Sequence, residues 1–168
     1  MRNSCIFRNY QDKDIIDIME IYNFYILNSM SNFEETPLKY IYFKKFIIEI
    51  IKLNLPFIIC EFDKKIIGFA YLNKFRDKSG YRFTYENSIY IKENYINKGI
   101  GNLLLKKLII KSKKNNKIKS IIAVIGGEKN EASVNIHKKN GFKLIGTLKK
   151  VGYKKNKWLN SILMQKNI

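Results

Sequence analysis

A β-strand pattern, a turn with two glycines and an amphipathic helix follow one another in this sequence, and this succession constrains the fold most. Residues 82–91 are rich in β-branched and aromatic side chains, which predicts a long strand. Gly99 and Gly101 lie in the turn 94–101, and leucine and isoleucine recur at helical spacing in 102–114. Glycines before a helix let backbone N–H groups approach a phosphate, although a glycine turn also serves simply as a connection. The pattern predicts an α/β chain with a candidate phosphate site.

Two nucleotide-binding patterns do not fit this turn. The dinucleotide fingerprint needs a third glycine and a downstream acidic residue, and neither occurs in the expected place. The P-loop signature, in which Gly-Lys is followed by Ser or Thr, is also absent. These motifs therefore do not identify the ligand.

The remaining periodicity predicts one strand, two helices, three strands, a helix, a strand, a helix and two strands, in that order. Asp12 is the predicted N-cap of the first helix, which ends near Asn28, and Gly141 is the predicted C′ residue of the last. A chain of 168 residues supports one sizeable core, which predicts a single domain over residues 1–168. The predicted strands are 5–10, 57–62, 66–75, 82–91, 118–125, 142–151 and 158–165, and the later helices are 38–53, 102–114 and 130–140.

Composition predicts a soluble, cytoplasmic protein without a metal site. The first ten residues lack the apolar core of a secretory signal, and no segment approaches the length of a membrane span. Cys5 and Cys60 lie in apolar segments, which favours buried reduced thiols over a disulfide. A Cys/His metal site needs more ligands than two cysteines and the single His137 provide.

The formal charge of +18 raises the alternative of a basic module that binds nucleic acid. Lysine supplies most of this charge and is accompanied by an excess of isoleucine and asparagine, as A/T-rich codons acting on solvated positions would produce. We therefore interpret the charge as a surface bias. In this lysine-rich background, the few arginines are candidates for positions where chemistry resists replacement by lysine; they are Arg2, Arg8, Arg76 and Arg82.

One face of the predicted strand 82–91 is polar. Side chains alternate between the two faces of a strand, and the other face is mostly apolar. The polar face is either solvated, with an ion pair between Arg82 and Glu86, or a cleft that carries chemistry, and the residues alone leave both explanations open. Its members are Arg82, Thr84, Glu86, Ser88 and Tyr90.

The strand, the turn 97–101 and the following helix resemble the acetyl-CoA-binding motif of the GNAT acetyltransferase superfamily, and the element order agrees. Within it, the chain is similar to the phosphinothricin and methionine sulfoximine or sulfone N-acetyltransferases. Ile96 and Asn97 depart from the Gln or Arg and the Gly or Arg that are usual there. The matching stretches are 21–23, 32–34, 75–76, 81–91, 123–127, 130 with 132–133, 137 with 141–142, 151–152, 157–159 and 164–165.

The resemblance implies a GNAT fold, α/β (α+β), in which a mixed, mostly antiparallel sheet of six to seven strands is flanked by four helices. It also implies acetyl-CoA as co-substrate, no metal, and a homodimer with the closing hairpin around Trp158 as a contact. The implied acetyl-CoA contacts are Ile89, Tyr90, Ile91, Asn97, Lys98, Gly99, Ile100, Gly101, Asn102 and Asn130. The implied substrate contacts are Phe33, Arg76, Arg82, Thr84, Glu86, Asn87 and Ser88.

The implied reaction is acetylation of the amino group of a small amino-acid-like substrate. Glu86 is the carboxylate on the polar face and hence the candidate general base. Arg76 and Arg82 suit bidentate contact with a substrate carboxylate, and a backbone N–H of residues 88–91 would stabilise the oxyanion. His137, which taken alone is better explained as a packing or surface residue, would protonate the leaving thiolate.

Other activities remain as alternatives at this point. A GNAT enzyme can instead acetylate a protein N-terminus, an aminoglycoside or a polyamine, although a polyamine would meet the positive charges of Arg76 and Arg82. Ile96 is the one hint of a GNAT scaffold that has lost activity. The alternative of a different class is the basic nucleic-acid-binding module.

Overall fold

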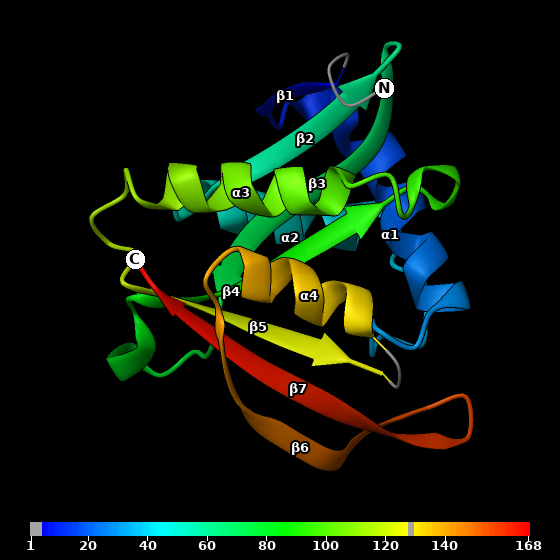
Figure 1. The fold of residues 1–168 in the computed structure, drawn as a ribbon. Coiled ribbons are helices and arrows are strands. Elements are labelled where there is room, and N and C mark those ends of the chain that lie inside the picture. The colour runs from blue at the N-terminus through cyan, green and yellow to red at the C-terminus, as the bar shows by residue number, and fades with distance from the viewer. Residues whose placement is uncertain (1–4, 128–129) are drawn as a thin grey trace.

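A seven-stranded sheet crosses the protein in the computed structural model, which describes residues 5–127 and 130–168 (Figure 1). Its strand order is β1-β2-β3-β4-β5-β7-β6, and all neighbours are antiparallel except the parallel pair β4 and β5. This sheet and four α-helices confirm the predicted fold class. The strands are β1 (Ile6–Asn9), β2 (Phe57–Phe62), β3 (Lys65–Lys74), β4 (Thr84–Ile91), β5 (Ser120–Gly126), β6 (Lys143–Lys154) and β7 (Lys157–Asn167); the helices are α1 (Ile15–Asn28), α2 (Tyr40–Lys52), α3 (Ile100–Ser112) and α4 (Glu131–Lys139).

Helices cover both faces of the sheet. In Figure 1, α3 and α4 lie in front of the strands, and α1 and α2 lie behind them. Strand alternation sorts the side chains of β4 between these layers. Tyr90 packs its ring on Tyr22 and Tyr25 of α1, whereas Asn87 contacts His137 of α4. The residues of β4 are therefore divided between two chemically different compartments.

The helices owe their positions to apolar stripes. Helix α2 buries Phe43, Ile47 and Ile50, spaced three to four residues apart, in the hydrophobic core, where Phe43 packs on Tyr22 of α1. Central strands β2 and β3 are buried on both faces, so they read as continuous apolar runs instead of alternating ones. The buried residues of α3 on the opposite layer are Ile100, Leu104, Leu105, Leu108, Ile109 and Ser112.

Asp12 does not cap the first helix as predicted. It begins a short 3₁₀ turn, Asp12–Asp14, and α1 starts only at Ile15. Asp14 makes the local contacts: it accepts a hydrogen bond from the backbone N–H of Gln11 and pairs with both terminal nitrogens of Arg8. A bidentate contact of this kind needs a planar guanidinium, so Arg8 has a structural role. Arg2 lies outside the described residues.

Arg82 lies outside β4, although the predicted strand began there. Residues Ser79–Tyr81 form a 3₁₀ turn, and the backbone N–H of Arg82 donates to Ser79 O at 3.1 Å. Arg82 therefore has helical dihedral angles, and β4 begins at Thr84. Strand alternation places Thr84, Glu86, Ser88 and Tyr90 on one face but does not extend to Arg82.

Cys5 and Cys60 form no disulfide, as predicted; Cys60 is buried, whereas Cys5 is only half-buried. Burial and the neighbouring Cys5 raise the pKa of the Cys60 thiol to about 12, so the thiol is protonated at neutral pH. Among the described residues, no helix is long and apolar enough to cross a membrane.

Candidate active site

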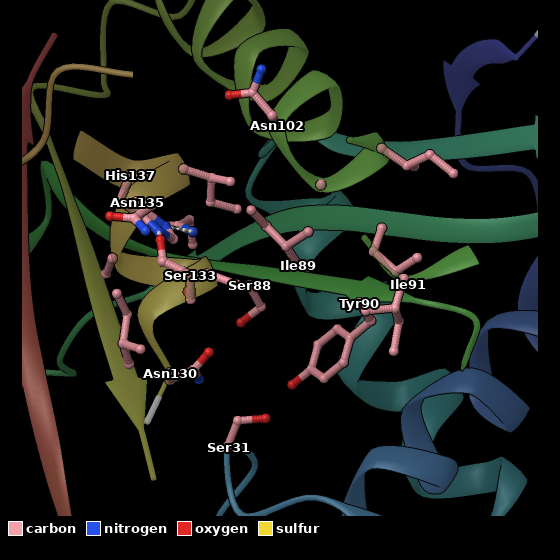
Figure 2. Close-up of a pocket in the computed structure, with 18 of the residues that line it drawn as sticks. Ser31, Ser88, Ile89, Tyr90, Ile91, Asn102, Asn130, Ser133, Asn135 and His137 are labelled. Atoms are coloured by element: carbon pink, nitrogen blue, oxygen red, sulfur yellow. Dashed lines mark hydrogen bonds between the residues drawn. The ribbon is translucent and has the colours of Figure 1, made fainter. Parts of the chain in front are cut away.

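A pocket opens where the parallel strands β4 and β5 separate. Their pairing covers only Thr84–Glu86 with Ser120–Ile122, yet both strands continue beyond it. The resulting pocket has a volume of about 450 Å³ and is bordered by both strands and by the first turns of α3 and α4. Figure 2 shows Ser88, Ile89, Tyr90 and Ile91 of β4 on one side and Ser133 and His137 of α4 on the other.

Backbone groups of β4 point into this opening. The N–H of Lys92 donates to Ile67 O of β3 at 2.8 Å, so by strand alternation Tyr90 and Ser88 also direct their backbone groups toward β3. Ile89 and Ile91 then direct theirs away from β3, toward the gap. The hydroxyl of Tyr25 already donates to Ile91 O at 2.8 Å. The N–H and C=O of Ile89 are therefore available to an extended ligand.

The glycine turn forms the end of the pocket. Gly99 has a φ of 79° and caps α3, which begins at Ile100, two residues earlier than predicted. Only residues that tolerate left-handed geometry suit this position, and the turn directs the free N–H groups of the first helical turn outward. These N–H groups and the helix dipole favour an anionic ligand such as a pyrophosphate.

His137 lines the pocket, is almost fully buried and is hydrogen-bonded through both ring nitrogens. Its Nδ1 lies 2.7 Å from Ser133 O, and its Nε2 lies 3.0 Å from Nδ2 of Asn87. A carbonyl oxygen only accepts, so Nδ1 carries the proton and Nε2 accepts the amide N–H of Asn87. Burial also lowers the pKa of His137, which favours the neutral ring. This arrangement directs no proton at the pocket and departs from the predicted role as donor to the thiolate.

Glu86 lies on the opposite face of β4 from His137, at the last residue pair before β4 and β5 separate. It is half-buried, and its charge acts on Tyr71 and Tyr90, whose rings stack on one another. Burial raises the pKa of Glu86 to about 7, and the positive charge of Arg76 partly opposes that rise. A carboxylate with this pKa accepts and releases a proton near neutral pH.

The two arginines predicted to bind substrate are placed differently. Arg76 is close enough for its charge to act on Glu86. Arg82 instead donates to Ser79 O at 3.2 Å and holds its guanidinium 4.6 Å from the ring centre of Phe83. Within the described residues Arg82 forms no ion pair with Glu86. The ion-pair explanation of the polar face is therefore wrong.

A comparison with known families bears directly on this arrangement. The family model described as an acetyltransferase (GNAT) domain matches residues 7–163. The chain belongs to the GNAT acetyltransferase family. It is an acetyl-CoA-dependent N-acetyltransferase, and this membership favours the enzyme over the nucleic-acid-binding module.

Individual relatives cover nearly the whole GNAT chain. Phosphinothricin N-acetyltransferase of Alcaligenes faecalis is 34% identical over 165 residues, which are 98% of this chain and 83% of the relative. L-methionine sulfoximine/L-methionine sulfone acetyltransferase of Pseudomonas paraeruginosa is 28% identical over 156 residues, 92% of this chain and 90% of that protein. The crystal structure of a GNAT superfamily phosphinothricin acetyltransferase from Sinorhizobium meliloti in complex with AcCoA has a TM-score of 0.92 and 31% identity, and covers 98% of this chain and 89% of that chain.

The pocket fits the acetyl-CoA that GNAT enzymes use. The backbone of Ile89 suits an amide-containing chain, and the N-terminus of α3 suits a pyrophosphate. Oδ1 of Asn87 is buried and accepts no hydrogen bond from the described part of the chain, so it is suited to accept one from a ligand. The predicted cofactor contacts that line the pocket are Ile89, Tyr90, Ile91, Asn97, Gly99, Ile100, Gly101, Asn102 and Asn130.

Lys98 is the exception among the predicted cofactor contacts. Its Nζ donates to Asn94 O at 2.6 Å, and its side chain does not line the pocket. Ile96, the departure from the family pattern, does line it. Apart from Asn130 and His137, no residue of the wall formed by β5 and α4 was predicted from the sequence to have a role, although residues 123–127 and 132–133 match the family. The lining residues missed are Tyr25, Ser31, Tyr95, Ile96, Ala123, Val124, Ile125, Gly126, Ala132, Ser133, Asn135 and Ile136.

Phe33 reaches the sheet from the segment between α1 and α2. Its ring lies against two glycine backbones: a Cβ atom on Gly126 would lie 2.6 Å from the ring, and one on Gly152 would lie 2.3 Å from it. Next to it, Asn32 donates to the hydroxyl of Tyr90 at 3.3 Å. Contacts of β4, β5 and β6 thus determine where Phe33 lies.

Proposed function

We propose that this GNAT enzyme acetylates the amino group of a small amino-acid-like substrate of the phosphinothricin, methionine sulfoximine or methionine sulfone type, with Glu86 as general base. The observation that carries the proposal is the position of Glu86, half-buried where β4 and β5 separate, with a pKa of about 7. The activities named for the two curated relatives support the substrate class.

The residues around Glu86 have complementary roles in this proposal. Acetyl-CoA supplies the acetyl group as an activated thioester. Glu86 removes a proton from the substrate ammonium, because only the neutral amine is a nucleophile. Arg76 binds the substrate carboxylate or another oxyanion, and the N–H of Ile89, directed into the opening, is the candidate donor to the developing oxyanion.

The substrate class is tested by thiol release from acetyl-CoA with a panel of amines. We expect turnover of phosphinothricin, methionine sulfoximine and methionine sulfone, and none of N-acetyl-phosphinothricin, which lacks a free amine. Isothermal titration should show acetyl-CoA binding without the amine. Turnover of peptides with a free N-terminus but of none of these amino acids would contradict the proposed substrate class and favour a protein acetyltransferase.

We further propose that the enzyme is a homodimer that pairs through the β6–β7 hairpin. Strand β6 is the last strand of the described sheet, and an unpaired edge readily associates with another chain. The hairpin exposes large apolar side chains, which favour association. They are Leu144, Ile145, Leu148, Val151, Tyr153 and Trp158.

Light scattering should give twice the 19.9 kDa mass of one chain. Trp158→Lys is expected to shift the enzyme to the monomer, because it would place a charge in a contact that is apolar in the wild type. Ile41→Lys on α2, where Ile41 is also exposed, is the matched control and should leave the mass unchanged. A monomeric wild-type enzyme would refute the dimer.

A further inference from the structure

Asn73 stands directly opposite Glu86 in the sheet and has no role in the mechanism above. The two are register partners of the antiparallel strands β3 and β4. Partners in such a pair point to the same face, with Cβ atoms about 4.5–5.5 Å apart. Asn73 is therefore on the α1 and α2 side of the sheet, beside the carboxylate and away from the Asn87–His137 pair.

The amide oxygen of Asn73 lacks a donor. Oδ1 is buried, and no group among the described residues donates a hydrogen bond to it. An unsatisfied buried acceptor costs about 1–3 kcal/mol, so such atoms are uncommon and each calls for an explanation. An ionised Glu86 cannot satisfy it, because a carboxylate only accepts. The missing donor must come from another molecule or from protonated Glu86.

A substrate ammonium has the required chemistry. It carries several N–H groups on one atom, so one can face Glu86 while another faces the amide oxygen. Unlike a second carboxylate, an amide oxygen does not compete for the proton and does not repel ionised Glu86. Two different acceptors side by side would hold the nitrogen and fix its orientation, which is a known source of rate enhancement.

We propose that Asn73 is a specificity-determining residue of the substrate site that accepts an N–H of the amine held by Glu86. This inference rests on the proposed function, since it assumes that an amine binds beside Glu86. It assigns to β3 a part in recognition of the amino group, in addition to the part that Arg76 takes in recognition of the acidic group.

Two substitutions separate this role from a purely structural one. Asn73→Leu keeps the approximate volume but removes the acceptor, and we expect kcat/KM for the amine to fall about 10- to 100-fold. Asn73→Asp keeps an acceptor but adds a negative charge, so it should retain more activity and shift the acidic limb of the pH profile of kcat/KM upward. Neither should change the affinity for acetyl-CoA, because Asn73 does not line that pocket.

The pH profile also distinguishes which end of the amide faces the carboxylate. The charged and titratable groups on this side of the sheet include Tyr22, Tyr25, Glu34, Tyr71, Arg76 and Tyr90, and both variants retain them. If Asn73 accepts from the amine, Asn73→Leu leaves the acidic limb in place. An upward shift in Asn73→Leu would mean that the amide donates to Glu86 and would overturn the inference.

Lys74→Ala is the matched control, because Lys74 is the next residue of β3, is exposed and points to the other face. It should leave kcat/KM unchanged, and melting curves of all three variants establish that they are folded. A wild-type enzyme that turns over the amino acids while Asn73→Leu matches it would overturn this inference alone. A wild-type enzyme inactive toward every amino acid of the panel would overturn the proposed function together with it.

Discussion

Glu86→Gln should lower kcat by about 10²- to 10⁴-fold, the usual contribution of a general base, while the Kd for acetyl-CoA stays unchanged. The amide cannot accept the ammonium proton, but it retains the size of the side chain. Glu86 lies outside the lining of the cofactor pocket, so binding there should not respond. Steady-state kinetics and titration calorimetry on the same preparation measure both quantities. Unchanged turnover would remove Glu86 from the base role.

The pH profile gives an independent reading of the same residue. Burial raises the pKa of Glu86 to about 7, so wild-type kcat/KM should increase with pH through this value as the carboxylate ionises. The residual activity of Glu86→Gln should lack this limb. A limb that persists in the variant would belong to another group.

Stability should change in the opposite direction to activity. The folded-state pKa of Glu86 lies above its ordinary value of 4.5, so the protonated form is favoured by folding. Its contribution is fully present below pH 4.5 and is lost as pH rises through about 7. Glu86→Gln avoids this loss. Its free energy of unfolding should be about 1–3 kcal/mol higher than that of the wild type at pH 8 and similar to it at pH 4. Denaturant unfolding at both pH values tests the sign.

Local sequence signals were sufficient for most of the fold. The apolar stripes of helices α1 and α2 can be recognised from the spacing of their own residues. Gly99 marks the start of α3, because glycine readily adopts the left-handed backbone conformation found there. The error at Arg82 also has a local cause. Residues 82–83 look like the strand that follows, but the 3₁₀ turn of Ser79–Tyr81 captures the Arg82 N–H. The β-propensity of individual residues does not reveal a competing turn of this kind.

The site was less predictable because it depends on register. Alternation within β4 correctly grouped Glu86 with Thr84 and Ser88, since that is a property of a single strand. The residue at which β4 and β5 cease to pair cannot be predicted from the sequence, and the pocket opens because the strands separate there. Asn73 was missed for the same reason: its relation to Glu86 comes from the pairing of two strands, and nothing in the sequence around it is unusual.

Two contacts with β6 fix the segment between α1 and α2: a hydrogen bond to the backbone of Asn32 and the packing of Phe33. Lys154 of β6 is buried and donates from Nζ to Ile26 O at 2.7 Å and to Asn32 O at 2.6 Å. Phe33 follows immediately and lies against Gly152. The backbone beside Phe33 is thus fixed by one residue of β6, while its ring occupies the space above another.

Gly152→Ala should therefore displace the Phe33 ring. The added Cβ would lie 2.3 Å from the ring, which no real contact allows, and Lys154 prevents the backbone at Asn32 from moving away freely. Overpacking of this kind typically costs about 1–3 kcal/mol, so we expect a loss of stability of that size. If Phe33 contacts the substrate, displacement of its ring should also raise KM for the amine, by about 5- to 20-fold. The affinity for acetyl-CoA should be much less affected.

Gly146→Ala provides the matched control on the same strand. Nothing lies within 4 Å of a Cβ at Gly146, and its backbone does not adopt a positive φ. An alanine there restricts mainly the unfolded chain, so stability should stay equal or rise by about 0.4–1 kcal/mol. Both variants remove one glycine from β6, and only one of them meets Phe33. Equal losses of stability in the two would show that β6 requires glycine for its own backbone, and a normal KM in a destabilised Gly152→Ala would place the substrate away from Phe33.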